Sequence, residues 1–331
     1  MKKTSLFLLV LSISATVLFS SFISSDNIVN GTNINPPDEF EILLNYLETN
    51  NAFVNGESLP IIMADEVKKN IKNPKFHVID IRNEGWFEYG HIKNAANVKA
   101  ENLLSYFEST INPLDFDKIV LICYSGQSAA YYSSLLRIAG YNNVYSLKWG
   151  MSSWRQDFAD NAWNKNIKNE YATKLETTVN AKPENVSHPL LNTGKTEAKE
   201  ILQTRLEILF ATPYKEFIIK STDVFENLTN YYVINYWEED KCIGHIPGAH
   251  HFQPDALSFS KDLLTLPANQ KVVVYEATGQ KAAYMVAYLN VLGYDTGNLA
   301  YGANSFMNEL LKEKGLDAFS NKEINMFPII E

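Results

Sequence analysis

Cysteine is scarce in this sequence of 331 residues, which contains only Cys123 and Cys242. Two cysteines cannot build the disulfide framework of a small secreted domain or supply the ligands of a structural zinc site. Histidine is also scarce, with six residues, and His250 and His251 form the only adjacent pair. Because no cysteine or acidic residue stands at ligand spacing from this pair, we expect no metal site and no cofactor.

Positive charge is in short supply as well. The 29 lysine and arginine residues are outnumbered by 38 aspartate and glutamate residues, which gives a formal net charge of −9. No basic patch stands out along the sequence, so we expect no nucleic-acid partner. The remaining composition, 46% hydrophobic and 20% charged, is typical of a globular protein, and the length allows two or three domains.

The N-terminus has the pattern of a secretory signal peptide. Residues 1–3 carry positive charge, residues 6–19 are almost all apolar, and small serine residues follow. We therefore predict a signal peptide over residues 1–25 and an exported protein, in the periplasm or outside a bacterial cell. No cysteine lies near the end of this segment, which argues against a bacterial lipoprotein anchor. The apolar run is near the lower length limit for a membrane span. An uncleaved N-terminal anchor is therefore the alternative, and it is the one contact with a membrane that we expect.

Residues 26–57 are expected to form a polar spacer and an amphipathic helix. Residues 26–37 are rich in asparagine, whereas residues 38–49 repeat apolar side chains at helical spacing. From Leu59 onward, short apolar strands alternate with helices, which predicts a mainly parallel sheet covered on both faces. The predicted strands are 61–62, 76–81, 95–98, 119–122 and 144–147, and helices are expected from 64, over 102–111 and over 152–158.

The central stretch of the chain is residues 119–139. An apolar run at 119–122 is typical of a buried parallel strand, and Cys123 follows it at once. A polar loop over 124–128 leads into residues with helical spacing, which Gly140 terminates. Unpaired backbone N–H groups and the helix dipole at such a helix start favour a thiolate. Cys123 is therefore a candidate nucleophile, although a cysteine after an apolar strand is also often a small buried hydrophobe.

The second half of the sequence repeats the first. Residues 272–283 (VVVYEATGQKAA) align with residues 119–130 (IVLICYSGQSAA). The Gly-His-Ile triplet at 244–246 likewise aligns with the one at 90–92, and the turn at 299–303 aligns with the turn at 147–151. Order and spacing that hold over about a hundred residues indicate a repeat of one fold. The repeat predicts two domains, over 58–160 and 215–320, joined by a linker and helix over 161–214.

These landmarks resemble the rhodanese family of sulfurtransferases. The marks are Asp80-Ile81-Arg82, Gly90-His91-Ile92, the six-residue loop 123–128 and the turn 147–154. The resemblance implies an α/β fold of two tandem rhodanese-like domains, each a mainly parallel sheet flanked by helices. It also implies that Cys123 carries sulfane sulfur as a persulfide, taken from thiosulfate or a similar donor and passed to a thiol or cyanide acceptor. Tandem members usually keep one active and one inactive domain.

The resemblance assigns the substrate site to the loop that begins at Cys123. The expected substrate-binding residues are Tyr124, Ser125, Gly126, Gln127, Ser128 and Lys148, with Asp80 and Arg82 paired as structural support. Family members often carry arginine, lysine or threonine in this loop, but here its side chains are neutral. Backbone N–H groups and hydroxyls are then expected to hold the persulfide anion. The expected partners are a small sulfur-containing anion and a thiol acceptor.

The second copy lacks the nucleophile. Glu276 takes the place of Cys123, and a carboxylate cannot form a persulfide and repels an anionic substrate. Asn235 and Trp237 replace the acidic and basic pair of the first copy. We therefore expect the second domain to be catalytically silent. Cys242 lies outside the loop and is expected to be structural or incidental.

Two other functions are weighed against sulfur transfer. Related phosphatases hold phosphate with an arginine at the end of the cysteine loop, but here Ser128 and Ala129 end it, so phosphatase activity is not expected. The second alternative is a non-catalytic binding or scaffold protein that keeps the fold and a vestigial cysteine. The neutral loop and the silent second domain favour that alternative, whereas the intact motifs around Cys123 favour an enzyme.

Overall fold

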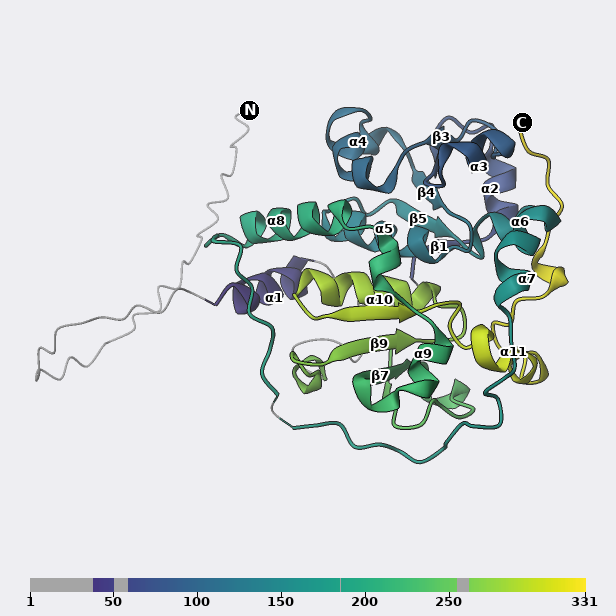
Figure 1. The fold of residues 1–331 in the computed structure, drawn as a ribbon. Helices are drawn as coiled ribbons and strands as arrows, with labels where there is room; N and C mark the ends of the chain where they lie inside the picture. The colour runs from purple at the N-terminus through teal and green to yellow at the C-terminus, as the bar shows by residue number, and fades with distance from the viewer. Residues whose placement is uncertain (1–37, 51–58, 185, 255–261) are drawn as a thin grey trace, which may run out of the picture. The chain divides into compact units, whose positions relative to one another are not determined.

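Two five-stranded parallel sheets form the core of the computed structural model (Figure 1). The structure describes residues 38–50, 59–184, 186–254 and 262–331, which all belong to one unit that begins at Pro37. The predicted signal peptide over 1–25 and the polar spacer over 26–37 lie outside the described residues. Within the described ranges, no helix is long and apolar enough to cross a membrane.

The first sheet has the strand order β1-β5-β4-β2-β3, and all neighbouring strands pair in parallel. Its strands are β1 (Ile61–Ile62), β2 (Phe76–Asp80), β3 (Ala96–Asn97), β4 (Lys118–Ile122) and β5 (Val144–Leu147). The helices of this half are α2 (Ala64–Asn70), α3 (Glu84–Tyr89), α4 (Leu103–Ser109), α5 (Gln127–Ile138), α6 (Gln156–Asn161) and α7 (Trp163–Asn166). All five strands predicted from the sequence are present.

The second sheet repeats this topology with the order β6-β10-β9-β7-β8. Its strands are β6 (Ile218–Ile219), β7 (Tyr231–Tyr236), β8 (His250–Phe252), β9 (Lys271–Tyr275) and β10 (Thr296–Leu299). Its helices are α9 (Ser221–Glu226), α10 (Gln280–Val291) and α11 (Asn304–Glu313). The same strand order in both halves confirms the two tandem α/β domains that the sequence repeat predicts.

Both faces of each sheet are buried, as the apolar runs of the central strands require. Along β4, Ile119 and Leu121 enter the core that includes α5, whereas Val120 and Ile122 enter a separate core on the opposite face. Successive residues of a strand point to opposite faces, so a strand buried on both sides is continuously apolar. Each fully buried side chain of this kind contributes about 1.5–3 kcal/mol.

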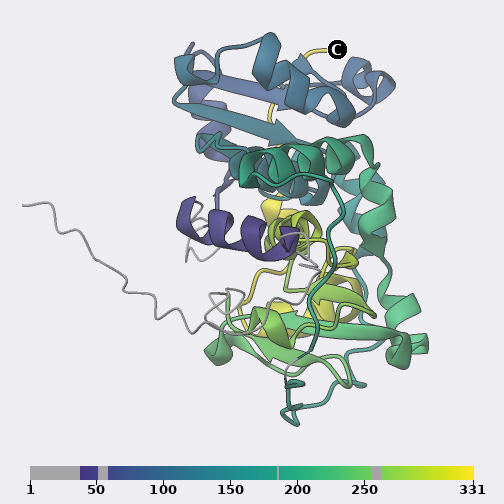
Figure 2. The ribbon, with the colours of Figure 1, turned by 90° about the vertical axis from the view of Figure 1, so that its left-hand side faces the viewer.

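Helices α5 and α10 join the two halves. Their side chains share one hydrophobic core, and the Ser134 hydroxyl donates to the carbonyl oxygen of Tyr284 at 2.9 Å. The Tyr284 hydroxyl donates in turn to the carbonyl oxygen of Pro60 at 2.9 Å. Beside them, α1 (Glu39–Asn50) lies alongside α8 (Ala198–Ala211), as Figure 2 shows. The apolar face expected for α1 is buried in this core: Phe40, Leu43, Leu44 and Leu47.

The closing helix expected over 152–158 is wrong in its position. A 3₁₀ turn occupies Gly150–Ser153, and α6 begins only at Gln156. The helix cannot start earlier because Arg155 has extended backbone angles (φ −147°, ψ 155°). The segment expected to be a plain linker also begins with a short helix, α7, whose first residue Trp163 is fully buried.

A segment near the C-terminus returns to the first domain (Figure 1). The backbone N–H of Ile330 donates to the carbonyl oxygen of His91 at 2.9 Å, and the reciprocal bond has the same length. The indole N–H of Trp154 donates to the carbonyl oxygen of Pro328 at 3.0 Å. Phe327 and Ile329 pack onto the core on the outer face of the first sheet. This segment therefore completes the domain that carries Cys123.

Candidate active site

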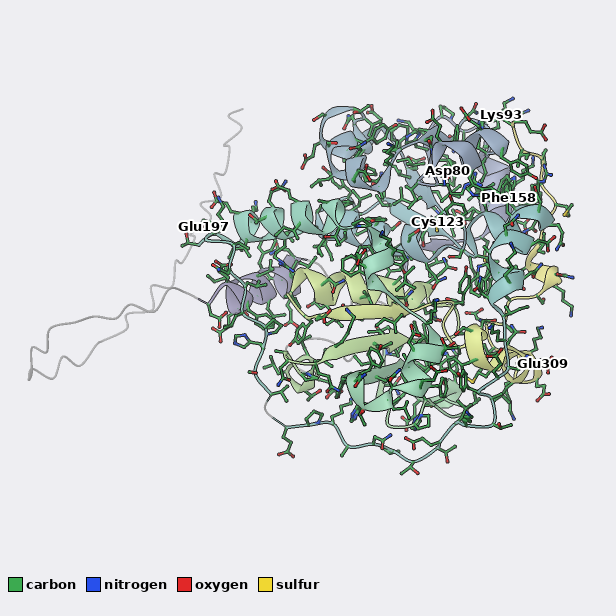
Figure 3. All side chains as sticks on the ribbon, in the orientation of Figure 1. Asp80, Lys93, Cys123, Phe158, Glu197 and Glu309 are labelled. Carbon is green, nitrogen blue, oxygen red and sulfur yellow. The ribbon has the colours of Figure 1, made fainter. Side chains whose placement is uncertain are left out.

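Cys123 lies directly after β4, where its sulfur meets the start of α5 (Figure 3). Its Sγ accepts hydrogen bonds from the backbone N–H of Gly126 at 3.1 Å and of Ala129 at 3.4 Å. The residue is 2% exposed. Backbone donors at a helix N-terminus stabilise negative charge, so this geometry is suited to a thiolate or a persulfide anion.

The loop after Cys123 is shorter than the six residues expected. Helix α5 begins at Gln127, and Gly126 is its N-cap residue with φ of +90°. This left-handed conformation suits glycine and turns the chain sharply enough to aim two N–H groups at the sulfur. The predicted loop residues Gln127 and Ser128 therefore form the first turn of the helix.

Gln127 contacts the second domain instead of a substrate pocket. Its side-chain oxygen accepts from the backbone N–H of Tyr301 at 2.8 Å and from the Asn298 amide at 3.2 Å. The equivalent Gln280 of the second domain accepts from the backbone N–H of Trp149 at 2.8 Å. Each loop thus holds the turn of the opposite domain, and both glutamines are buried. The side-chain oxygen of Gln127 is committed to this reciprocal interface, and the expected substrate-binding role of the residue stays a prediction.

Three other loop side chains, Tyr124, Ser125 and Ser128, are half-buried and are the ones that solvent reaches. Burial raises the pKa of Tyr124, so its phenol stays neutral. The Tyr124 ring meets the Trp86 ring edge to face, with centroids 5.9 Å apart. The Ser125 hydroxyl accepts from the Gln127 amide at 3.0 Å. The polar groups at the mouth of the loop are therefore neutral hydroxyls and amides.

An aromatic cluster that sequence reasoning missed lies against the loop. Trp163 donates its indole N–H to the carbonyl oxygen of Ser125 at 3.0 Å. Its ring packs against Trp149, Tyr301 and Phe319, with centroids 4.7–5.1 Å apart. Trp149 and Tyr301 occupy the same place in the two repeated turns, and both have positive φ, 64° and 61°. That repeated aromatic was the available signal, whereas nothing in the sequence pattern marks Trp163 or Phe319.

Asp80, at the end of β2 (Figure 3), forms a fully buried ion pair with Arg82. The Arg82 Nη2 donates to the Asp80 carboxylate at 2.7 Å and to the Gly90 carbonyl oxygen at 2.7 Å. The guanidinium carbon also lies 4.8 Å from the centre of the Phe158 ring. This pair ties together two of the sequence motifs, Asp80-Ile81-Arg82 and Gly90-His91-Ile92, and supports the loop without facing solvent.

Lys148 is turned toward an acidic partner. Its ammonium group lies 2.7 Å from the Asp317 carboxylate and 5.2 Å from the centre of the Trp149 ring. The lysine side chain is 22% exposed and the aspartate side chain 43%. The charge that the sequence offers to the substrate is thus already paired in the structure.

The second domain fills its own loop with Glu276. The buried carboxylate accepts from the Thr278 N–H at 2.7 Å, from the Thr278 hydroxyl at 2.9 Å and from the Lys281 N–H at 3.1 Å. These donors stand at the positions of Ser125 and Ser128 in the first loop, so donors from the second loop itself hold the carboxylate in place of a substrate. Cys242 lies outside this loop, where its sulfur accepts from the Asn235 amide at 3.2 Å.

We expect the contribution of Glu276 to stability to fall as the pH rises. Burial raises the pKa of Glu276 above its ordinary value of 4.5, although the bonds from Thr278 and the charge of Lys281 oppose the rise. The stability from the protonated carboxyl is therefore full below pH 4.5 and is lost as the pH passes through the raised pKa. Urea unfolding of wild type and Glu276→Gln from pH 4 to pH 8 measures this. A difference between the two proteins that does not change with pH would contradict it.

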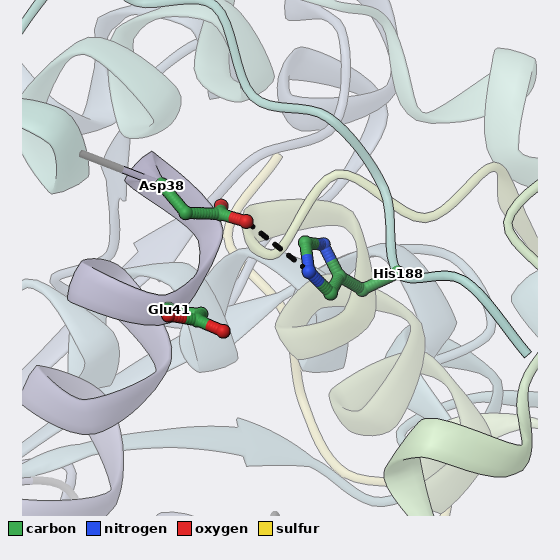
Figure 4. Close-up of side chains that lie close together, drawn as sticks. All are labelled: Asp38, Glu41 and His188. Atoms are coloured by element: carbon green, nitrogen blue, oxygen red, sulfur yellow. Dashed lines mark ion pairs between the residues drawn. The ribbon is translucent and has the colours of Figure 1, made fainter. Parts of the chain in front are cut away.

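One group of metal-ligating side chains is close enough to hold an ion within the described ranges. Atoms of Asp38, Glu41 and His188 all lie within 4.8 Å of one another (Figure 4). His188 Nε2 lies 3.2 Å from the Asp38 carboxylate, and its ring stacks on Phe40. Since Glu41 is exposed and the other two already pair, this group ties the interdomain segment to α1 without need of an ion.

Comparison with known protein families places this site in a recognised domain. A model of the rhodanese-like domain matches residues 63–157 and again residues 211–309. The chain therefore belongs to the rhodanese-like domain family and contains two copies of the domain. This confirms the resemblance seen in the motifs.

Three similar proteins illustrate the relationship. The chain is 36% identical over 80 residues to the thiosulfate sulfurtransferase GlpE of Shewanella oneidensis, across 24% of this chain and 75% of that protein. It is 30% identical over 93 residues to the tRNA uridine(34) hydroxylase of Erwinia tasmaniensis, across 27% of each chain. A rhodanese-related protein from Thermoplasma volcanium, solved by crystallography, is 27% identical over 28% of this chain and 87% of its own, with a TM-score of 0.25. The chain thus spans three quarters of the first relative but only about a quarter of the second.

Proposed function

We propose that this protein is a sulfurtransferase that carries sulfane sulfur as a persulfide on Cys123. The observation that carries the proposal is the pair of backbone N–H groups, of Gly126 and Ala129, that converge on Sγ at the start of α5. A thiolate is the nucleophile in sulfur transfer, and the same donors stabilise the negative Cys–S–S⁻ that follows. The thiosulfate sulfurtransferase among the relatives supports the same class of activity.

The proposed cycle has two steps. The Cys123 thiolate attacks the outer sulfur of a donor such as thiosulfate or a persulfide, and sulfite or a thiolate leaves with the electron pair of the broken S–S bond. A thiol or cyanide then takes the terminal sulfur and regenerates the thiolate. The second domain takes no chemical part, because Glu276 stands at the position of the nucleophile. The proposal includes export from a bacterial cell, which rests on the pattern of residues 1–25.

The test is the intact mass of the purified protein after incubation with sulfane donors. Wild type should gain one sulfur atom, which cyanide then removes, because a persulfide gives its terminal sulfur to that acceptor. Cys123→Ser should gain none. Cys242→Ser, which keeps the other cysteine, is the matched control and should load like wild type.

Two outcomes would reject this function. If no donor loads Cys123 although an alkylating agent still labels it, the thiol is accessible but the site does not transfer sulfur. A non-catalytic binding or scaffold protein would then explain the fold better. Sulfur that depends on Cys242 instead would move the chemistry outside the loop.

A further inference from the structure

The mouth of the Cys123 loop offers no free positive charge among the side chains assigned to it. Tyr124, Ser125 and Ser128 are neutral, and the Gln127 amide is used by the second domain. The two N–H groups that converge on the sulfur already bond to Cys123 itself. The loop is therefore equipped to hold one negative charge, the one on sulfur.

The two cations assigned to the site are both neutralised. Lys148 pairs with Asp317 at 2.7 Å. Arg82 is fully buried and pairs with Asp80, which neutralises its charge. A further carboxylate, that of Glu323, accepts from the Trp149 indole N–H at 2.9 Å. Each of the two cations therefore has its own carboxylate partner, and Glu323 adds a further negative charge. The named groups have no net positive charge to offer a substrate.

Aromatic side chains contact the outer side of the Cys123 loop. Trp86 of α3 contacts Tyr124 on one side and Tyr89 on the other, with ring centroids 5.9 and 5.5 Å apart. Tyr89 is 53% exposed, and Trp86 is half-buried. Rings of this kind bind the apolar part of an organic molecule better than a small dianion.

We propose that Cys123 takes its sulfur from an organic persulfide, R–S–SH, in preference to the thiosulfate dianion. This inference rests on the proposed sulfurtransferase function and names its donor. The thiolate of Cys123 attacks the outer sulfur of R–S–SH and forms the new Sγ–S bond. The S–S bond between the inner and outer sulfur of the donor breaks, and RS⁻ leaves with its electron pair. The proton of the outer sulfur passes to RS⁻, which leaves Cys123–S–S⁻ and RSH. Thiosulfate would bring two negative charges to a thiolate for which the two assigned cations, Lys148 and Arg82, are already paired with carboxylates.

The experiment compares the rates at which three donors load wild-type Cys123, measured by intact mass at constant pH. The donors are thiosulfate, the persulfide of N-acetylcysteine, and the persulfide of N-acetylcysteine methyl ester, which lacks the carboxylate. We expect loading to be fastest from the ester and slowest from thiosulfate. Added salt should raise the rate with thiosulfate the most, because thiosulfate carries two full negative charges, and the rate with the ester the least.

A pair of variants isolates the effect of charge. Ser125→Lys places a cation at the half-buried loop position, and Ser125→Gln is the neutral control of similar size, since both remove the same hydroxyl. Relative to the glutamine variant, the lysine variant should load from thiosulfate about tenfold faster or more, because a nearby opposite charge raises the encounter rate. With the methyl ester persulfide, the lysine and glutamine variants should load at similar rates.

The outcomes separate this inference from the function on which it rests. Loading from thiosulfate as fast as from the ester would overturn the donor class and leave the sulfurtransferase standing. Equal thiosulfate rates in the two Ser125 variants would overturn it as well. Failure of all three donors would instead reject the sulfurtransferase itself.

Discussion

Replacing Asp80 by asparagine should lower the free energy of unfolding by about 3–5 kcal/mol, the usual loss when one partner of a buried ion pair is removed. Asparagine keeps the shape of the side chain, but it leaves the Arg82 guanidinium without a counter-charge. That guanidinium is 1% exposed, and its Nη1 already lacks a hydrogen-bond partner. Urea unfolding of wild type and Asp80→Asn measures the difference.

Two controls define the cause. The double variant Asp80→Asn with Arg82→Met should recover much of the loss, because removing both charges leaves no buried ion unpaired. The second domain has no ion pair at the equivalent positions, where the uncharged residues Asn235 and Trp237 are buried. Glu66→Gln breaks a partly exposed pair with Lys118 and should cost only about 0–1 kcal/mol. A similar cost for Asp80→Asn and Glu66→Gln would show that burial of the first pair does not matter.

Replacing Gly150 by alanine should both destabilise the fold and disturb the loop that holds Cys123, the proposed nucleophile. A Cβ at this position would lie 2.5 Å from the carbonyl oxygen of Cys123 and 2.6 Å from the backbone nitrogen of Gly126. These are backbone atoms, so the loop must move to make room. The φ of +59° adds strain of about 1–2 kcal/mol and overpacking adds about 1–3 kcal/mol. We expect both the free energy of unfolding and the loading of Cys123 with sulfur to fall. Urea unfolding measures the first, and intact mass of the folded protein measures the second.

The chain supplies matched glycines for this test. Gly302 packs against the second loop as Gly150 does against the first, so Gly302→Ala should be destabilising but should retain the sulfur loading of Cys123. Gly140 also has positive φ, at +107°, but nothing lies within 4 Å of its added Cβ, so Gly140→Ala reports the strain alone. If Gly150→Ala and Gly302→Ala impair loading equally, the effect comes from general instability and not from the Cys123 loop.

Local pattern was enough to predict the sheets and the place of Cys123 between a strand and a helix. The strands are short apolar runs between turn residues, and the Asp80–Arg82 pair joins residues only two apart. The repeat of the Cys123 loop around Glu276 predicted a second domain of the same topology, and the parallel strand order confirms it. These features depend on neighbours in sequence, which is why periodicity and spacing reveal them.

Contacts between distant segments could not be predicted in the same way. Gln127 looked like a loop residue open to substrate, but its partner Tyr301 lies 174 positions further along the chain. Lys148 looked like a free charge, but Asp317 lies 169 positions away. A single polar residue carries no periodic signal of its partner, so such pairs become visible only once the fold brings them together.

The bonds between His91 and Ile330 also mean that the first domain is completed by residues that are synthesised after the second domain. The domain with Cys123 leaves the ribosome first, yet the carbonyl oxygen that caps the Trp154 indole belongs to a residue made 174 positions later. Until residues 327–330 dock, the first domain lacks the bonds between Ile330 and His91 and the cover of Phe327 and Ile329 on the outer face of its sheet. The domain that is proposed to do the chemistry is thus made first, but it is completed only by residues made after the second domain.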